Sequence, residues 1–483
     1  MNESIDFSKN LSKNIELIKT NFHQSPELSV RTIELVSKRK CSLVYLDGIV
    51  NTELIREGIM DPLFSIRVID EDFINTLMSR YIRSESVHEV ISLSDSIDGV
   101  ARGKTLVLVD GFERGLLVNT AEWEKRQIEQ STRQRNVQGP LIAFSEQLSA
   151  NLNVIHNFIQ SPNLMVEKRQ MGTSSKTDVA IVYLTDRVDQ KVLTKTLDQI
   201  DTLQVDYALE SRIIDKTLEN KQKTIFPLIF TTELPDATVS ALYEGKIAIL
   251  MNGTPSASIV PCLFVQFFQQ PGDYYVKPGN SMRFLTWISF FLTTLLPGSY
   301  VALVKFHSHW VPKKFVKEFF THKHTLFPVW FEVFLIIFLL QLLSYGSFKI
   351  SKDSIIVVSL ISTVTIGSTA VDAKLIHPLS LVVVGVTFLA NTLLTVGTFS
   401  LTLYHLRYAF LLIGSLFGFT GMIVGFVLMI IHLALLRSVG VPYLAPIIPF
   451  NAKEMKDVFF RGNLHQLINS KHTYPHDQKE QPK

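Results

Sequence analysis

The sequence is poor in cysteine. Cys41 and Cys262 are its only two cysteines in 483 residues, and they lie far apart. Two isolated cysteines cannot form the disulfide framework of a small secreted domain, so we interpret both as buried hydrophobic residues in a reducing compartment. Residues 1–13 are polar and contain no apolar run that resembles a signal peptide. We therefore expect the large N-terminal part to stay in the cytoplasm.

A strong charge imbalance and the common catalytic motifs are also missing. The formal net charge of +3 is too close to neutral to indicate a nucleic-acid partner. The sequence has neither a Gly-x-Ser-x-Gly elbow nor a paired-cysteine motif. Residues 99–105 (Gly-Val-Ala-Arg-Gly-Lys-Thr) resemble a phosphate-binding loop. That stretch is one residue too short, and a strand follows where a helix N-terminus should hold phosphate. We predict that the protein is not an enzyme and has no cofactor.

Metal-ligand spacing is absent as well. Two histidine pairs, His307 with His309 and His322 with His324, have no carboxylate or cysteine at ligand spacing nearby. We expect histidines at a membrane interface and no metal site.

What the sequence does have is a series of long apolar stretches in its last third. Residues 284–304, 355–371 and 378–396 carry no charge, and the only ionisable group in 409–436 is His432. Each stretch is long enough to cross a hydrocarbon core of ~30 Å as a helix. A soluble helix of that length would show a polar face. The sequence therefore predicts an α-helical integral membrane domain over residues 284–436, surrounded by membrane lipid.

The number of membrane spans depends on a fifth apolar stretch. Residues 328–345 contain Glu332 and Gln341, so this stretch either crosses the membrane or lies in its interface. The basic tail after residue 436 favours the cytoplasmic side by the positive-inside rule. That choice gives four spans, although it places the basic loop from Lys305 to Lys323 outside.

The N-terminal half contains an internal repeat. Residues 41–54 and 179–193 share a pattern of apolar strand, turn and helix. Residues 103–111 match 245–253 with equal spacing, and the two end in Asp-Gly and Asn-Gly, which are typical of hairpin turns. Residues 36–120 and 175–265 are thus predicted to be two copies of one α/β unit.

The expected fold class is a duplicated α/β cytoplasmic N-terminal region followed by an α-helical integral membrane domain. The charged residues 121–138 are either a solvated connector or a docking strip for a neighbouring subunit. The expected divisions are a helical arm (1–35), a first α/β subdomain (36–138), a linker helix (139–174), a second α/β subdomain (175–283), the membrane domain (284–436) and a cytoplasmic tail (437–483).

Polar stripes run along two of the apolar stretches. The first contains Ser359, Ser362, Thr363, Ile366 and Thr369 on one helix face, with Asp372 just beyond; the second contains Thr387, Asn391, Thr395 and Thr398. Lipid disfavours such faces, so they point to other helices or to water. One interpretation is helix packing by small polar residues. The other is a pore, in which one stripe repeats around a symmetric ring and an acidic rim attracts cations.

The last apolar stretch carries a third pattern. Gly414, Gly418, Gly421 and Gly425 recur at helical spacing. Small residues on one face allow close approach of another helix, so we predict a packing face here.

Several stretches together resemble the A subunits of GerA-type spore germinant receptors. The resemblance is carried by residues 174–180, 231–236, 244–255, 267–275, 296–307 and 440–446. Two departures stand out. Residues 367–371 read Gly-Ser-Thr-Ala-Val where the family usually has Gly-Gln-Ala-Ala-Val, and Lys374 replaces a usual glycine. Residues 328–345 are also more apolar than the amphipathic helix usual in the family. The departures leave ion selectivity and the number of spans open.

The resemblance implies a location and a role. Such subunits lie in the spore inner membrane with a transporter-like, nutrient-binding B subunit and a lipoprotein C subunit. They are similar to pentameric, nutrient-gated cation channels whose opening triggers germination, and residues 355–372 would line the conduit. The alternative is a scaffold without a conduit that relays nutrient binding to other germination proteins.

Overall fold

The computed structural model describes residues 6–66, 72–84, 86–123, 142–219, 222–269, 279–312, 325–346, 369–394, 399–452 and 454–459. The chain divides into two compact units. The α/β unit contains the described residues up to 219 together with 229–261. The helical unit contains 222–228 and the described residues from 262 onwards.

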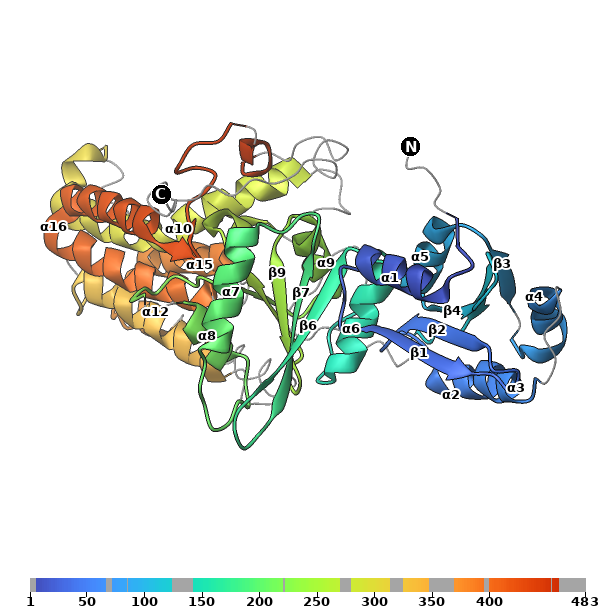
Figure 1. The fold of residues 1–483 in the computed structure, drawn as a ribbon. Helices are drawn as coiled ribbons and strands as arrows, with labels where there is room; N and C mark the ends of the chain where they lie inside the picture. The colour runs from blue at the N-terminus through green and yellow to red at the C-terminus, as the bar shows by residue number, and fades with distance from the viewer. Residues whose placement is uncertain are drawn as a thin grey trace. The chain divides into compact units, whose positions relative to one another are not determined.

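The α/β unit contains two five-stranded sheets that share one strand order among the described residues (Figure 1). Every strand pair recorded in them is antiparallel. The first sheet has the order β1-β2-β4-β5-β3 and the second β6-β7-β9-β10-β8. This identity of order confirms the duplicated α/β fold. The strands are β1 (Leu28–Glu34), β2 (Lys40–Leu46), β3 (Val87–Val90), β4 (Lys104–Val109), β5 (Gly115–Asn119), β6 (Leu164–Met171), β7 (Thr177–Leu184), β8 (Phe230–Thr232), β9 (Ile247–Met251) and β10 (Ala257–Val260).

Short helices accompany both sheets. The strands β4 and β9 each follow a helix and a glycine, and each ends in the Asp-Gly or Asn-Gly turn that the matching stretches 103–111 and 245–253 predicted. Gly111 and Gly253 adopt φ of 89° and 86°, which a glycine tolerates without steric cost. The helices are α1 (Leu11–Asn21), α2 (Thr52–Ile55), α3 (Asp61–Phe64), α4 (Phe73–Thr76), α5 (Leu93–Ala101), α6 (Leu148–Phe158), α7 (Gln190–Asp201), α8 (Arg212–Leu218) and α9 (Pro235–Tyr243).

The repeat begins earlier in the chain than its sequence pattern indicated. Asp110 accepts a hydrogen bond from the Leu11 amide at the start of α1 (3.2 Å). Asn252 accepts one from the Leu148 amide at the start of α6 (3.1 Å) in the same way. The expected arm (1–35) and linker helix (139–174) therefore supply the first helix and first strand of each copy.

The buried side chain of Glu27 joins the two copies. The ring of His156 on α6 lies 2.9 Å from the Glu27 carboxylate, and Lys168 lies 3.3 Å from the other carboxylate oxygen. Asn153, also on α6, donates to the carbonyl oxygens of Gly48 and Glu122 at 2.9 Å each. The helix α6 also packs against α9, β7 and β9 of its own copy. It therefore holds one copy against the other.

The helical unit consists of long apolar helices and two shorter ones in the described residues. Arg283–Phe306, Val329–Gly346 and Phe399–Leu435 are long and apolar enough to cross a membrane, and Pro378–Thr392 is a shorter apolar helix. The expected span 355–371 lies outside the described residues except for its last three positions. The helices are α10 (Gly279–Phe306), α12 (Val329–Gly346), α14 (Thr369–Asp372), α15 (Pro378–Thr392) and α16 (Phe399–Leu435).

The helix α16 differs from the single span expected over 409–436. It begins at Phe399 and breaks at Gly418, whose φ of 63° and ψ of −153° are not helical. Residues 399–417 and 419–435 form two arms that lie beside each other, because Gly425 of the second arm is next to Phe410 and Ile413 of the first. The sequence missed the break because glycine fits an unbroken apolar run as readily as a turn.

The two arms set the direction of the chain through the helical unit. The first arm runs parallel to α10, since Arg407 bonds Thr293 and Gly418 lies beside His307. The second arm returns, and Ser438 then accepts a hydrogen bond from the Cys262 amide (2.8 Å). The residues after the hairpin therefore lie at the end of the helical unit where α10 begins.

The helix α10 and the first arm of α16 are in close contact. A Cβ atom at Gly414 would lie 2.5 Å from the carbonyl oxygen of Gly298, closer than real Cβ contacts. The absence of a side chain at this crossing lets the two backbones touch.

We predict that replacing Glu27 destabilises the joint between the copies. Glu27→Ala removes the buried anion that His156 and Lys168 contact and should cost about 2 kcal/mol. Hydrogen exchange of the β1 and β6 amides in the full-length chain measures this loss. Glu57→Ala, which breaks the exposed Arg56–Glu57 pair, should change it by less than ~0.5 kcal/mol. Equal effects of the two substitutions would contradict a structural role for Glu27.

We predict a pH dependence that originates at Asp215 on α8. Burial raises the pKa of Asp215 from 3.8 to about 6; the Ser258 hydroxyl, which donates to the carboxylate, opposes the shift, and Glu219 adds to it. The folded state thus binds the proton more tightly than the unfolded state. Its stabilisation is complete below pH ~4 and is lost as the pH rises through about 6.

The test compares Asp215→Asn with the wild-type protein across that range. Between pH 4 and 7 the wild type should lose on the order of 2 kcal/mol of unfolding free energy relative to this variant. Ser258→Ala removes the opposing hydrogen bond and should move the midpoint to higher pH. Parallel stability curves for the wild type and Asp215→Asn would contradict the assignment.

We predict that Gly414 cannot be enlarged. Gly414→Ala forces the α10 backbone away and should destabilise the helical unit by about 2 kcal/mol. Gly385→Ala is the matched control, because nothing lies within 4 Å of a Cβ added there, and alanine favours a helix over glycine. Thermal unfolding of the detergent-solubilised chain measures both. A Gly414→Ala protein as stable as Gly385→Ala would show that the crossing is loose.

Candidate functional site

Ionisable side chains are buried between the apolar helices of the helical unit. Glu332 on α12 is 0% exposed, and Arg407 on the first arm of α16 is 3% exposed. A charged group among membrane helices is costly, so it faces the protein interior and marks a position that folding or function requires. These two side chains and their partners form the candidate site.

The Arg407 cluster joins three helices. Arg407 Nε donates to the carbonyl oxygen of Thr293 on α10 (3.1 Å), and Nη2 donates to Asn391 Oδ1 on α15 (3.0 Å). The guanidinium lies 5.3 Å from the centre of the Tyr404 ring, within cation–π range. In the described parts of the chain, no carboxylate forms an ion pair with Arg407. Carbonyl dipoles and an aromatic ring thus accommodate its charge.

The Glu332 cluster joins α10, α12 and α15. Glu332 Oε2 accepts hydrogen bonds from the Ser380 hydroxyl (2.9 Å) and from the His377 amide (3.1 Å). The Tyr300 hydroxyl lies 3.2 Å from Ser380 Oγ and extends the network to α10. The carboxylate therefore binds the first turn of α15, where unpaired amides favour an anion.

Chemically, both clusters hold helices in fixed positions. Each places hydrogen bonds between helices that apolar side chains alone would let slide. Among the described residues, no group of three His, Cys, Asp or Glu side chains could hold a metal ion. The geometry is that of an apolar helix bundle with polar cross-links.

The structure places the two polar stripes differently. Thr387 and Asn391 of the second stripe are buried at 0% and 3% exposure, inside the helical unit. Thr387 donates to the Val383 carbonyl, and Asn391 accepts from Arg407. By contrast, Thr369 and Asp372 at the end of the first stripe are exposed. Six members of the two stripes lie outside the described residues: Ser359, Ser362, Thr363, Ile366, Thr395 and Thr398.

The glycines of α16 do not share one face. Gly414 contacts α10, and Gly418 is the break between the arms. A Cβ at Gly421 or Gly425 would meet Ile413, and at Gly425 also Phe410, all on the first arm. Two of the four glycines thus serve the contact between arms, and one serves the contact with α10.

The histidines expected at the interface lie near the hairpin turn. His307 lies 4.6 Å from Trp310 and 5.2 Å from Phe419, measured between ring centres. Lys305 donates to the Ser415 carbonyl close by. His322 and His324 are outside the described residues.

Sequence reasoning missed Arg407 as a site residue. The expected span began at residue 409, because His405 and Arg407 interrupt the apolar run. The available signal was the spacing of Thr402, Leu403, Leu406 and Phe410, which continues the buried helix face across the arginine. A charged residue that falls on the buried face of an apolar helix does not mark the end of that helix.

Comparisons with known proteins point to one family. Residues 16–473 match the family described as Bacillus/Clostridium GerA spore germination protein. Spore germination protein KA of Bacillus subtilis strain 168 is 31% identical over 94% of this chain and 85% of its own length. Spore germination protein GerLA of Bacillus cereus is 28% identical over 95% of both chains.

One solved structure is similar in part. It is the N-terminal domain of the A subunit of the Bacillus megaterium spore germinant receptor GerK3, which is 26% identical. The match covers 54% of this chain and 98% of that domain, with a TM-score of 0.44. With the family match over nearly the whole length, the chain belongs to the GerA family of spore germination proteins.

Proposed function

We propose that this chain is the A subunit of a nutrient-responsive germinant receptor in the spore inner membrane. In this proposal, residues 355–372 of several identical copies line a cation conduit. Family membership supports the germinant receptor role, because the relatives are spore germination proteins. The proposed conduit rests on a difference in burial between the two polar stripes of one chain.

The observation that carries the conduit is the contrast between the stripes. Thr387 and Asn391 find their hydrogen-bond partners inside a single chain. The described end of the first stripe, Thr369 and Asp372, remains exposed. Because lipid is a poor neighbour for a hydroxyl or a carboxylate, that end needs water or another copy. A ring of copies would supply both and would place the Asp372 carboxylates at a cation-attracting rim.

The direction of the helices supports one membrane placement. The residues after the hairpin lie at the end where α10 begins, which favours the N-terminal region and the tail on the same, cytoplasmic, side. The helix α12 lies along its neighbours over its length: Glu332 bonds Ser380, and Gln341 accepts from Tyr408. We therefore infer that α12 crosses the membrane and does not lie in the interface.

The assembly completes the proposal. Closed symmetric rings are the common form of homo-oligomers, and the family resemblance favours a pentamer. A transporter-like B subunit would bind the nutrient, and a lipoprotein C subunit would complete the complex. Nutrient binding opens the conduit only if it favours the open arrangement over the closed one.

The proposal predicts that a bulky residue in the first stripe blocks cation flow. The receptor complex purified with its partner subunits and inserted in a planar bilayer should conduct when the nutrient is added. Ile366→Trp should remove most of that conductance, and Asp372→Asn should lower the preference for cations over anions. The control is Val382→Trp, at an apolar position of α15 that is 58% exposed, and it should conduct normally.

Two results would contradict the conduit. An intact wild-type complex that never conducts would favour the scaffold, which relays nutrient binding without ion flow. Normal conductance in Ile366→Trp would move the conduit to another helix.

A further inference from the structure

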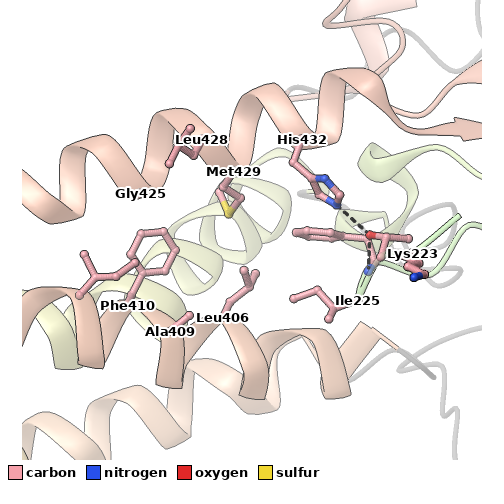
Figure 2. Close-up of a pocket in the computed structure, with 12 residues that line it drawn as sticks. Lys223, Ile225, Leu406, Ala409, Phe410, Gly425, Leu428, Met429 and His432 are labelled. Carbon is pink, nitrogen blue, oxygen red and sulfur yellow. Dashed lines mark hydrogen bonds between the residues drawn. The ribbon is translucent and has the colours of Figure 1, made fainter.

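The two arms of α16 enclose a groove of about 640 Å³. At the hairpin turn the arms touch through Gly421 and Gly425. Toward the other end they diverge, and residues 223–226 line the space between them (Figure 2). Thr224 bonds His432 of the second arm (3.0 Å), and the Ile225 carbonyl accepts from Thr402 of the first. The groove is therefore a built feature, and both arms hold its mouth open.

The lining changes character along the groove. Its depth is apolar, with Leu406 and Phe410 on one arm and Leu428 and Met429 on the other (Figure 2). Of its polar side chains, Lys223 and His432 lie toward the mouth (Figure 2), and Thr224 bonds His432 there. The described lining residues include no Asp or Glu. The groove thus matches a molecule with an apolar body and a negatively charged head.

The surroundings indicate which molecule that is. Leu428 is 60% exposed and Leu435 is 72% exposed, so the second arm presents apolar side chains outward. An apolar cavity of this size does not hold water favourably. A groove open to hydrocarbon fills with acyl chains, and basic side chains near the membrane surface attract anionic headgroups.

We propose that this groove binds one anionic phospholipid, with its acyl chains between the arms of α16 and its phosphate at Lys223 and His432. The inference rests on the membrane placement proposed above and not on the conduit. The mouth lies at the end of the helical unit where α10 begins, which that placement assigns to the cytoplasmic leaflet. The lipid would fill the space that residues 222–228 keep open between the arms.

The test uses the full-length receptor complex in phosphatidylcholine vesicles with a trace of phosphatidylglycerol that carries a photoactivatable acyl chain. Mass spectrometry should locate the cross-links on residues 406–413 and 425–432. Unlabelled phosphatidylglycerol should compete, and additional phosphatidylcholine should not. One lysine near an anionic surface contributes about a fivefold preference, so Lys223→Gln should reduce labelling about fivefold.

Matched variants separate charge, shape and nonspecific effects. Lys223→Arg keeps the charge and should keep the labelling. Ala409→Phe fills the groove and should prevent labelling without changing the charge. Lys191→Gln removes an exposed lysine of α7 and should have no effect.

Three results would overturn the inference. The first is labelling spread evenly over all exposed apolar helices. The second is labelling that Lys223→Gln and Ala409→Phe leave unchanged. The third is a disulfide between copies of a Leu428→Cys protein, which would show that a second copy fills the groove. Conductance is measured separately, so a conducting complex without selective labelling would leave the proposed function standing while this inference fails.

Discussion

A buried arginine without an acidic partner in the described residues sets the arrangement of the helical unit. Arg407 lies among apolar helices, where an unsatisfied guanidinium would cost several kcal/mol. Its hydrogen bonds to Thr293 and Asn391 meet that cost only while α10, α15 and α16 keep their positions. The contact between Gly298 and Gly414 depends on the same positions, because it requires α10 and the first arm to touch directly. Polar bonding and close packing therefore select one arrangement together.

That arrangement determines where the hairpin of α16 returns the chain. With the first arm fixed beside α10, the break at Gly418 has to return the chain to the end where α10 begins. There the Ser438 hydroxyl accepts a hydrogen bond from the Cys262 amide and donates one to the Leu228 carbonyl. The ring of Phe268 stacks on that of Trp287, with 3.8 Å between the ring centres. Three segments far apart in the sequence thus meet at one end of the unit. One of these segments, residues 222–228, lies between the diverging ends of the two arms. The groove between the arms exists for that reason.

The sequence predicted the fold class and the repeat because both depend on local patterns. Apolar runs without charge indicate membrane helices, and Gly-Lys before a strand with Asp-Gly or Asn-Gly after it appears twice. The earlier start of each copy was also visible: Phe-Ser-x-x-Leu-Ser-x-Asn occurs at 7–14 and 144–151, and Gln-Ser-Pro at 24–26 and 160–162. Asn14 and Asn151 use this motif alike, each bonding the backbone of the serine six residues before it.

Other features could not be predicted, because they depend on contacts distant in the sequence. Gly418 and Gly414 have similar apolar neighbours in the sequence. Only the tertiary structure shows that Gly418 forms the hairpin turn and that Gly414 forms the contact with α10. Thr387 and Asn391 looked as suitable for a pore as the first stripe does. Their burial depends on tertiary contacts, such as the hydrogen bond from Arg407 to Asn391. A helical pattern identifies a polar face, but the partner of that face comes from the tertiary structure.

The joint between the two copies shows how a duplicated fold becomes a defined pair. Equivalent helices place His156 where the first copy has Lys19, and equivalent strand starts place Glu27 where the second copy has Asn163. Lys19 is exposed, whereas His156 and Glu27 are buried against each other. Had both copies kept the same residues, the surface that joins them could repeat and extend into an open array. The second copy has Asn163 at the position of Glu27, so it lacks the carboxylate that bonds a helix equivalent to α6. The joint therefore forms once within each chain.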